Sequence, residues 1–285
     1  MANNSKKLSS RKRKMRLAKI RIIVFTIIAL GLIFVAINAR GLCPFDPYEQ
    51  DLSIAYMAPD NVHIMGTDAF GRDMFSRVIM GAQVSVLSTL VLVTIITFTG
   101  MIVGIISGYY SGFIDSIIMR ISDFCMAFPG LVFALAVAAI LGGGIVNAII
   151  ALALISWPKY ARIARSQTLS TKALEYIQGE RAAGINDGKI IFKHILPNIF
   201  GPILVTAMLD IGTMMMELAG LSFLGLGAQP PMAEWGSMMS TGRSMLQTYP
   251  WVVLSPGIGI FISVVIFNLL GDGVRDLIDP RNKNY

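Results

Sequence analysis

Long apolar runs separated by short polar segments make up most of this chain. A hydrocarbon core about 30 Å thick requires about 20 consecutive apolar residues in a helix. The runs predict spans at about 20–39, about 84–107, two around the charge-free stretch 124–158, about 198–224, and within 249–271. The pattern therefore predicts an all-α integral membrane protein with six transmembrane helices.

The stretch 124–158 has room for two spans only if the chain reverses direction tightly within it. Gly142, Gly143 and Gly144 are consecutive there, and glycine readily adopts the positive φ angles of tight turns. We expect the third span to begin near Ser116 and end at these glycines, and the fourth span to follow them directly.

The composition supports a membrane protein. Of the 285 residues, 54% are hydrophobic and 14% are charged, and the mean hydropathy is +0.66; these values differ from those of soluble domains. The net charge of +7 could suggest a nucleic-acid partner, but nine of the 24 Lys and Arg residues lie within residues 1–21. Basic residues beside a span are typical of cytoplasmic anchoring. The expected partner is the lipid bilayer, and no nucleic acid.

The distribution of Lys and Arg predicts the orientation. With the N-terminus inside, nineteen of these residues fall in inner segments and four in outer segments, as the positive-inside rule requires. The first run is about 20 residues long and has no clear small-residue cleavage site after it, so an anchor is favoured over a cleaved signal peptide. The predicted organisation is a basic cytoplasmic tail (1–19), a first anchor (20–39), an extracytoplasmic segment (40–83), a five-helix core (84–272) with a cytoplasmic loop at 159–195, and a cytoplasmic tail (273–285).

The cytoplasmic loop contains the polar segment YIQGERAAGINDGKIIFKHILPN, Tyr176 to Asn198. Its apolar positions predict a short helix that Gly184 breaks or caps. Such a helix could dock on a partner protein, or it could lie on the inner membrane surface as an amphipathic helix. The pattern alone does not separate these interpretations.

Catalytic motifs are not evident. Gly179 and Gly184 have the glycine spacing of a phosphate-binding loop, but Ile185 and Asn186 follow where Lys and Ser or Thr are needed. The two histidines, His63 and His194, fall on opposite sides of the membrane in the predicted topology, and no metal site is expected. We therefore predict that the chain is not an enzyme.

Charged residues inside or beside the spans are the other candidates. Asp210 and Glu217 are seven residues apart, so they share one face of the fifth span, and ionisable groups at this depth normally face protein or a water-filled path. They are pathway candidates with the neighbouring Met214 and Met215, which could form a soft gate or simply pack between helices. A competing interpretation pairs one carboxylate with Arg120 of the third span.

Two outer segments also carry polar or aromatic side chains. Four charges, Asp68, Arg72, Asp73 and Arg77, precede the second span, and they either pair locally or meet a partner; local pairing is favoured. In the second outer loop, Trp235 is interpreted first as an interfacial anchor, and Arg243 lies nearby.

Several segments resemble the membrane subunits of binding-protein-dependent ABC importers. GTDAFGRDMFSRVIMGAQVSV (66–86), MRISDFCMAFPGLVFAL (from 119) and ELAGLSFLGLGAQPPMAEWGSMMSTGR (217–243) resemble permeases for dipeptides, oligopeptides and nickel. The loop 176–198 is similar to that family's cytoplasmic loop at Gly184 and Leu196-Pro197, although Gln178-Gly179-Glu180 stand in place of its Glu-Ala-Ala. The resemblance implies the ABC importer permease fold.

The resemblance also implies roles and partners. The expected partners are a second homologous permease subunit, two cytoplasmic ABC ATPases and an extracytoplasmic substrate-binding protein. The chain itself would bind no cofactor, since ATP and Mg belong to the ATPases. The residues implied in ATPase coupling are Gln178, Gly179, Glu180, Arg181, Ala182, Ala183, Gly184 and Asp187, and the candidates for docking the binding protein are Asp68, Arg72, Asp73, Arg77, Trp235 and Arg243.

The function implied is therefore half of a translocation pathway for di- or oligopeptides. Nickel or a metal chelate is the alternative substrate within the family. A self-contained channel or secondary transporter is a more distant alternative, which would predict internal repeats, and a membrane enzyme ranks last.

Overall fold

The computed structural model describes residue 20 and residues 22–278. The predicted basic tail 1–19 and residues 279–285 of the predicted C-terminal tail lie outside the described residues. The described part is helical, and apart from one isolated bridge between Thr67 and Asp73 it contains no β structure. The elements are an apolar helix (Ile22–Ile37), α2 (Ala39–Leu42), η1 (Leu52–Ile54), α3 (Met74–Tyr110), α4 (Gly112–Met126), α5 (Gly130–Ile140), α6 (Ile145–Lys172), α7 (Glu175–Ala182), α8 (Asp187–Ile190), the π-helix η2 (Ile191–Ile195), α9 (Leu196–Phe223), α10 (Trp235–Gly242), η3 (Arg243–Met245) and α11 (Trp251–Ile278).

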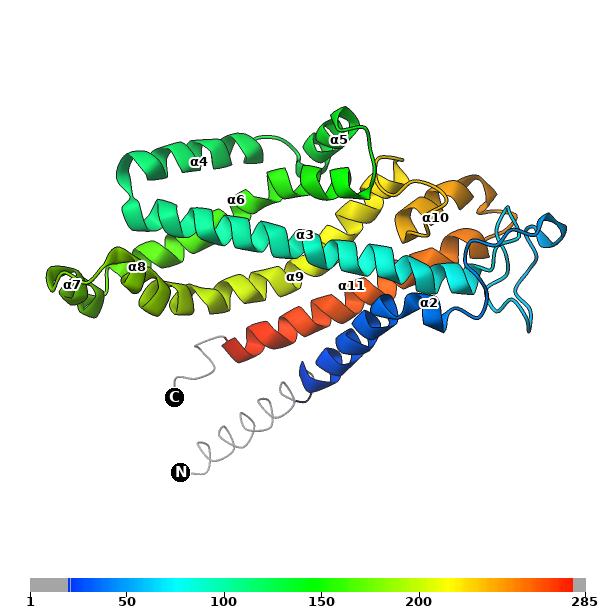
Figure 1. The fold of residues 1–285 in the computed structure, drawn as a ribbon, viewed down its shortest axis with the longest axis horizontal. Helices are drawn as coiled ribbons and strands as arrows, with labels where there is room; N and C mark the ends of the chain where they lie inside the picture. Colours follow the sequence, from blue (N-terminus) through cyan, green and yellow to red (C-terminus); the bar gives the residue numbers. More distant parts are fainter. Residues whose placement is uncertain (1–19, 21, 279–285) are drawn as a thin grey trace, which may run out of the picture.

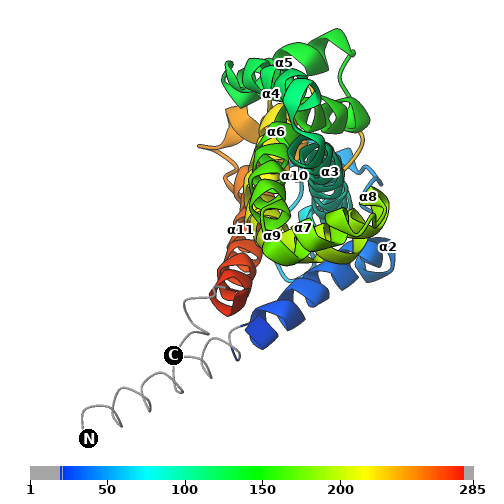
Figure 2. The same cartoon turned by 90° about the vertical axis from the view of Figure 1, so that its left-hand side faces the viewer.

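The long helices run side by side and separate two ends of the molecule. Figure 1 shows α7 and α8 at one end, and α10 with the segment between α2 and α3 at the opposite end. Seen along the long axis in Figure 2, α4 and α5 lie on one side of α3 and α6, and α11 with the first apolar helix lies on the other. The predicted loop helix and the predicted outer loops are therefore at opposite ends.

Length and composition identify fewer spans than the sequence predicted. Among the described helices, three are long and apolar enough to cross a membrane: Met74–Tyr110, Asp187–Phe223 and Trp251–Asp276. The pair α4 and α5 adds a fourth if it counts as one broken span, and Ile22–Ile37 is apolar but shorter. The prediction of an all-helical membrane protein is confirmed, and the count of six spans stays a prediction.

The predicted third span is not one straight helix. The axes of α4 and α5 differ by 91° across a short break, and Pro129 is the N-cap residue of α5. Proline lacks the amide hydrogen that a continuing helix would use, so the chain turns at this point. The reversal of the chain predicted after the third span is confirmed, because Gly142, Gly143 and Gly144 have φ angles of +85°, +72° and +96°.

Helix α6 extends into the segment that the sequence analysis assigned to the cytoplasmic loop. We expected the loop from residue 159, but α6 continues to Lys172. Its second half is polar on one side, yet Ala161, Ala164 and Thr168 are buried, at spacings that place them on one helix face. Burial of this narrow face against α3 maintains the helix beyond the apolar run.

Small residues bring α3 and α6 into close contact. Gly100, Gly104 and Gly108 repeat every four residues along α3, and a Cβ on Gly104 would lie 2.3 Å from the backbone oxygen of Ala161. The corresponding distance for Gly100 is 2.4 Å to the Cβ of Tyr160. Such stripes allow membrane helices to approach closely and pack by van der Waals contact. The stripe therefore sets the register between α3 and α6.

Trp235 packs inside the protein, so its interpretation as an interfacial anchor is wrong. Its side chain is 2% exposed, and its indole N–H donates to the backbone oxygen of Val78 at 2.9 Å. A Cβ on Gly81 or on Gly259 would lie 2.7 or 2.9 Å from the indole, so two glycines make room for the ring between α3 and α11. The adjacent Glu234 caps α10 by accepting from the amides of Gly236 and Ser237, and burial raises the pKa of its carboxyl group.

Candidate functional site

The predicted loop helix is present as α7, and a few contacts hold it to the ends of longer helices. Ile177 is its one buried residue. The Glu180 carboxylate lies 2.8 Å from Nε2 of His194, which belongs to η2 at the start of α9. The rings of His194 and Tyr176 are also in edge contact, with centroids 5.7 Å apart. The position of α7 is thus tied to that of the long helix α9.

Tyr109, at the end of α3, connects the same segment to the rest of the bundle. Its hydroxyl donates to the Asp187 carboxylate at 2.5 Å, and the Arg181 guanidinium lies 5.8 Å from the centre of its ring. The Lys172 ammonium donates to the Tyr109 backbone oxygen. A displacement of α7 would therefore be transmitted to α3, α6 and α9.

Gly184 ends the segment as the sequence predicts. Its φ angle is +77°. Its amide donates to the backbone oxygen of Arg181 at 3.0 Å, and the amide of Ile185 donates to that of Glu180 at 3.1 Å. This is the paired hydrogen-bond pattern of a Schellman helix end, which favours glycine at the left-handed position.

The surface of this segment suits contact with another protein. Most of the coupling residues that the resemblance implies are exposed, and Glu180 is partly exposed; the exposed ones are Gln178, Gly179, Arg181, Ala182, Ala183, Gly184 and Asp187. Four of them have no side chain beyond Cβ. The backbone of a partner can therefore approach this surface closely, in a way that long side chains would prevent.

A second polar group lies midway along the helices. Asp210 of α9 is 5% exposed, and its carboxylate accepts from the Lys159 ammonium at 2.6 and 2.9 Å and from the Tyr160 hydroxyl at 2.9 Å. The pairing proposed with Arg120 is wrong: among the described residues no interaction joins Arg120 to either carboxylate, and the neighbouring Asp123 pairs with Arg162. The buried carboxylate is thus neutralised by α6.

A cavity of about 200 Å³ brings several pathway candidates together. Its lining includes Lys159, Asp210, Met214 and Glu217. Met215 is not part of the lining and is 1% exposed, so it packs in the core. Lys159 is 53% exposed in its side chain, because it faces this open space. The cavity therefore presents one ammonium and two carboxylates.

The four charged residues just before and at the start of α3 pair locally, the arrangement that the sequence analysis favoured. Asp68 lies 2.7 Å from Arg72 and 3.6 Å from Arg77, and Asp73 caps α3 and contacts His63 at 3.0 Å. Asp73 and Trp235 are buried away from open space, so their assignment as docking contacts is wrong. Arg243 is exposed, while Asp68, Arg72 and Arg77 line a pocket.

The sequence analysis did not identify Lys159 and Tyr160 as site residues. Both were placed at the start of a loop, because the charge-free stretch 124–158 ends just before them. The signal that could have found them is the helical spacing of Ala161, Ala164 and Thr168, which continues α6 and points Lys159 toward α9.

Comparison with known proteins agrees with this geometry. A family profile described as "Binding-protein-dependent transport system inner membrane component" matches residues 100–284. The chain is similar to the dipeptide transport system permease protein DppC of Alkalihalophilus pseudofirmus, with 44% identity over 92% of this chain and 86% of that protein. It is equally similar to the glutathione transport system permease protein GsiD of Pectobacterium atrosepticum, with 44% identity over 90% of this chain and 85% of that one.

Solved structures show the same fold. A chain from the inward facing MetNI methionine ABC transporter superimposes with a TM-score of 0.59 at 18% identity, covering 72% of this chain and 97% of that one. An amino acid ABC transporter solved with histidines gives a TM-score of 0.51 at 17% identity, covering 73% of this chain and 94% of that one. At these identities the likeness concerns the fold alone.

Proposed function

The chain belongs to the family of binding-protein-dependent transport system inner membrane components, and from this membership we propose that it forms half of the translocation pathway of an importer for short peptides. As a member of that family it is a multi-pass permease of the cell membrane and a non-catalytic subunit of an ABC transporter. Its proposed partners are a second permease subunit, two cytoplasmic ATPases and an extracytoplasmic binding protein.

The substrate class follows from the two relatives. They are named for a dipeptide and for glutathione, both of which are small peptides with free amino and carboxyl groups. The cavity with Lys159, Asp210 and Glu217 offers both signs of charge to such a molecule. We place the peptide pathway along this cavity, and these relatives add no support for nickel.

The observation that carries the proposal is the attachment of α7. Its exposed surface is formed mainly by small or polar residues, whereas an amphipathic helix on a membrane needs a continuous face of large apolar side chains. Its anchored side contacts His194 and Tyr109, which lie at the ends of the long helices. A partner that moves α7 can therefore shift the helices between two arrangements, as alternating access requires.

The proposed topology has six crossings. They are Ile22–Ile37, α3, the bent pair α4 and α5, α6, α9 and α11, with both tails and α7 in the cytoplasm. The segment 40–83 and the loop containing α10 would be extracytoplasmic. The first part of the proposed cytoplasmic segment 159–195 is helical, since α6 continues to Lys172.

Reconstitution tests this function. The chain is placed in liposomes alone, with a sister permease and ATPases, and with the loaded binding protein added, and uptake of a labelled dipeptide is measured with and without ATP. We expect uptake only with every component and ATP, because the energy must come from the ATPases. Uptake by the chain alone would contradict the proposal and favour a channel or secondary transporter.

A further inference from the structure

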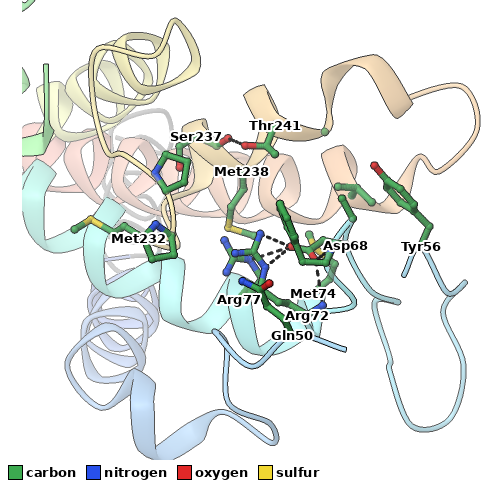
Figure 3. A pocket seen from close by; sticks show the side chains of 16 residues that line it. Gln50, Tyr56, Asp68, Arg72, Met74, Arg77, Met232, Ser237, Met238 and Thr241 are labelled. Atoms are coloured by element: carbon green, nitrogen blue, oxygen red, sulfur yellow. Dashed lines mark hydrogen bonds and ion pairs between the residues drawn. The ribbon is translucent and has the colours of Figure 1, made fainter. Parts of the chain in front are cut away.

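A pocket of about 250 Å³ lies at the end of the molecule opposite α7, between the segment that precedes α3 and the loop that carries α10. Its floor contains the buried side chains of Asp68, Arg72, Arg77 and Met238. Exposed residues, among them Phe70 and Thr241, form its mouth. Figure 3 shows the two guanidinium groups meeting at Asp68 on the pocket wall.

The Asp68 carboxylate has no capacity left for a further cation. One oxygen accepts from the amides of Phe70 at 2.8 Å and Arg72 at 3.0 Å. The other accepts from Nε of Arg72 at 2.7 Å and lies 2.7 Å from its Nη2. A carboxylate offers about four acceptor positions, and these contacts occupy them. Arg72 is therefore neutralised by Asp68.

Arg77 is left with a surplus of charge and of hydrogen-bond donors. It lies 3.6 Å from Asp68, beyond hydrogen-bond distance, and its Nη1 donates to the backbone oxygen of Pro47 at 2.9 Å. A guanidinium carries five N–H donors. Asp68 is the one acidic residue in the pocket lining, because Asp73 caps α3 and faces His63. The floor thus holds two cations and one anion.

We propose that this pocket receives a Glu or Asp side chain of the extracytoplasmic binding protein, with Arg77 as the group that pairs with its carboxylate. The inference rests on the proposed function, which requires such a protein at this end of the molecule. Arginine pairs with carboxylates through two parallel hydrogen bonds, and a cation buried without a full partner is costly until one arrives.

The pocket fits a single acidic side chain better than a free peptide. A free peptide also has an ammonium group, and the only carboxylate in the lining is already occupied. A Glu or Asp side chain presents one carboxylate on a short apolar stem, which the lining residues Met74, Met238 and Val252 can cover.

The test adds a negative charge at the mouth of the pocket. Thr241→Glu places a carboxylate there, which would compete for the cation and repel an incoming acid. Thr241→Gln has nearly the same size without the charge, and both changes lose the same hydrogen bond to the Ser237 backbone oxygen. Thr248→Glu is the positional control, since Thr248 is exposed beyond α10 and does not line the pocket. The melting temperature of each assembled transporter reports whether it is folded.

The measurement is the dissociation constant of loaded binding protein for the transporter in nanodiscs. We expect Thr241→Glu to weaken binding at least about tenfold, Thr241→Gln to weaken it less than about threefold, and Thr248→Glu to have the smallest effect. Acidic residues of the binding protein are then replaced by Gln in turn. One replacement should weaken binding to the wild-type transporter and have little further effect on Thr241→Glu.

Three results would overturn the inference. Equal losses with Thr241→Glu and Thr241→Gln would mean that the pocket does not recognise charge. Equal losses with Thr241→Glu and Thr248→Glu would mean a diffuse effect of surface charge. Binding of free dipeptide to the transporter without binding protein, abolished by Thr241→Glu, would make the occupant a peptide. A wild-type transporter whose uptake needs no binding protein would instead refute the proposed function.

Discussion

Replacing Gly184 with valine should separate membrane insertion from coupling. Gly184 has a φ angle of +77°, and no atom lies within 4 Å of the position that its Cβ would occupy. The cost of the new side chain is therefore backbone strain and not a steric clash. A non-glycine residue held in this region costs about 1–3 kcal/mol. This cost lowers the equilibrium constant for forming the intact helix end about 5- to 150-fold.

The strain should affect coupling and leave the spans unchanged. The two hydrogen bonds that close the helix end, from the amides of Gly184 and Ile185, require this backbone conformation. We expect normal membrane abundance, normal binding of loaded binding protein, and loss of both ATPase attachment and dipeptide uptake. Asparagine tolerates positive φ angles best among the other residues, so losses should increase from Gly184→Asn through Gly184→Ala to Gly184→Val.

A matched control lies at the start of α4, just after its connection to α3. Gly112 also has a positive φ angle, +64°, and open space around its Cβ position. Gly112→Val therefore introduces similar strain at the same end of the molecule but outside α7. We expect this variant to retain uptake. Equal losses in both variants would indicate general destabilisation, and normal uptake with Gly184→Val would refute the coupling role of α7 and favour a helix lying on the membrane.

The remaining predictions concern packing, the pathway and the topology. Gly104→Ala should lower the melting temperature in detergent, because its Cβ would lie 2.3 Å from a backbone oxygen of α6 and overpacking costs about 1–3 kcal/mol. Gly31→Ala should leave the melting temperature unchanged, because its Cβ would meet no atom within 4 Å. Asp210→Asn should reduce uptake while ATPase attachment stays normal, since it removes the carboxylate that pairs with an ammonium in the cavity; unchanged uptake would make the pair purely structural. A cysteine at Asp187 should be labelled by an impermeant reagent only from the cytoplasm and one at Thr248 only from outside, and the reverse pattern would overturn the topology.

Features that depend on a short stretch of chain could be predicted from the sequence. Apolar runs of span length require lipid or protein around them, so the membrane class and the helical architecture followed directly. The end of α7 at Gly184 and the reversal at Gly142, Gly143 and Gly144 also followed, because positive φ angles are a property of the residue itself. Likewise, Asp68 and Arg72 are four residues apart, so their pairing was favoured before the structure.

Features that depend on contacts between distant segments were decided only by the tertiary structure. The partner of Asp210 is Lys159, 51 residues earlier, and that pairing exists because α6 packs beside α9. The burial of Trp235 depends on Gly81 and Gly259, which lie on two other helices. A hydropathy pattern records how apolar each residue is but not which helix faces it, so the neutralisation of Asp210 and the surplus cation in the outer pocket required the packed arrangement.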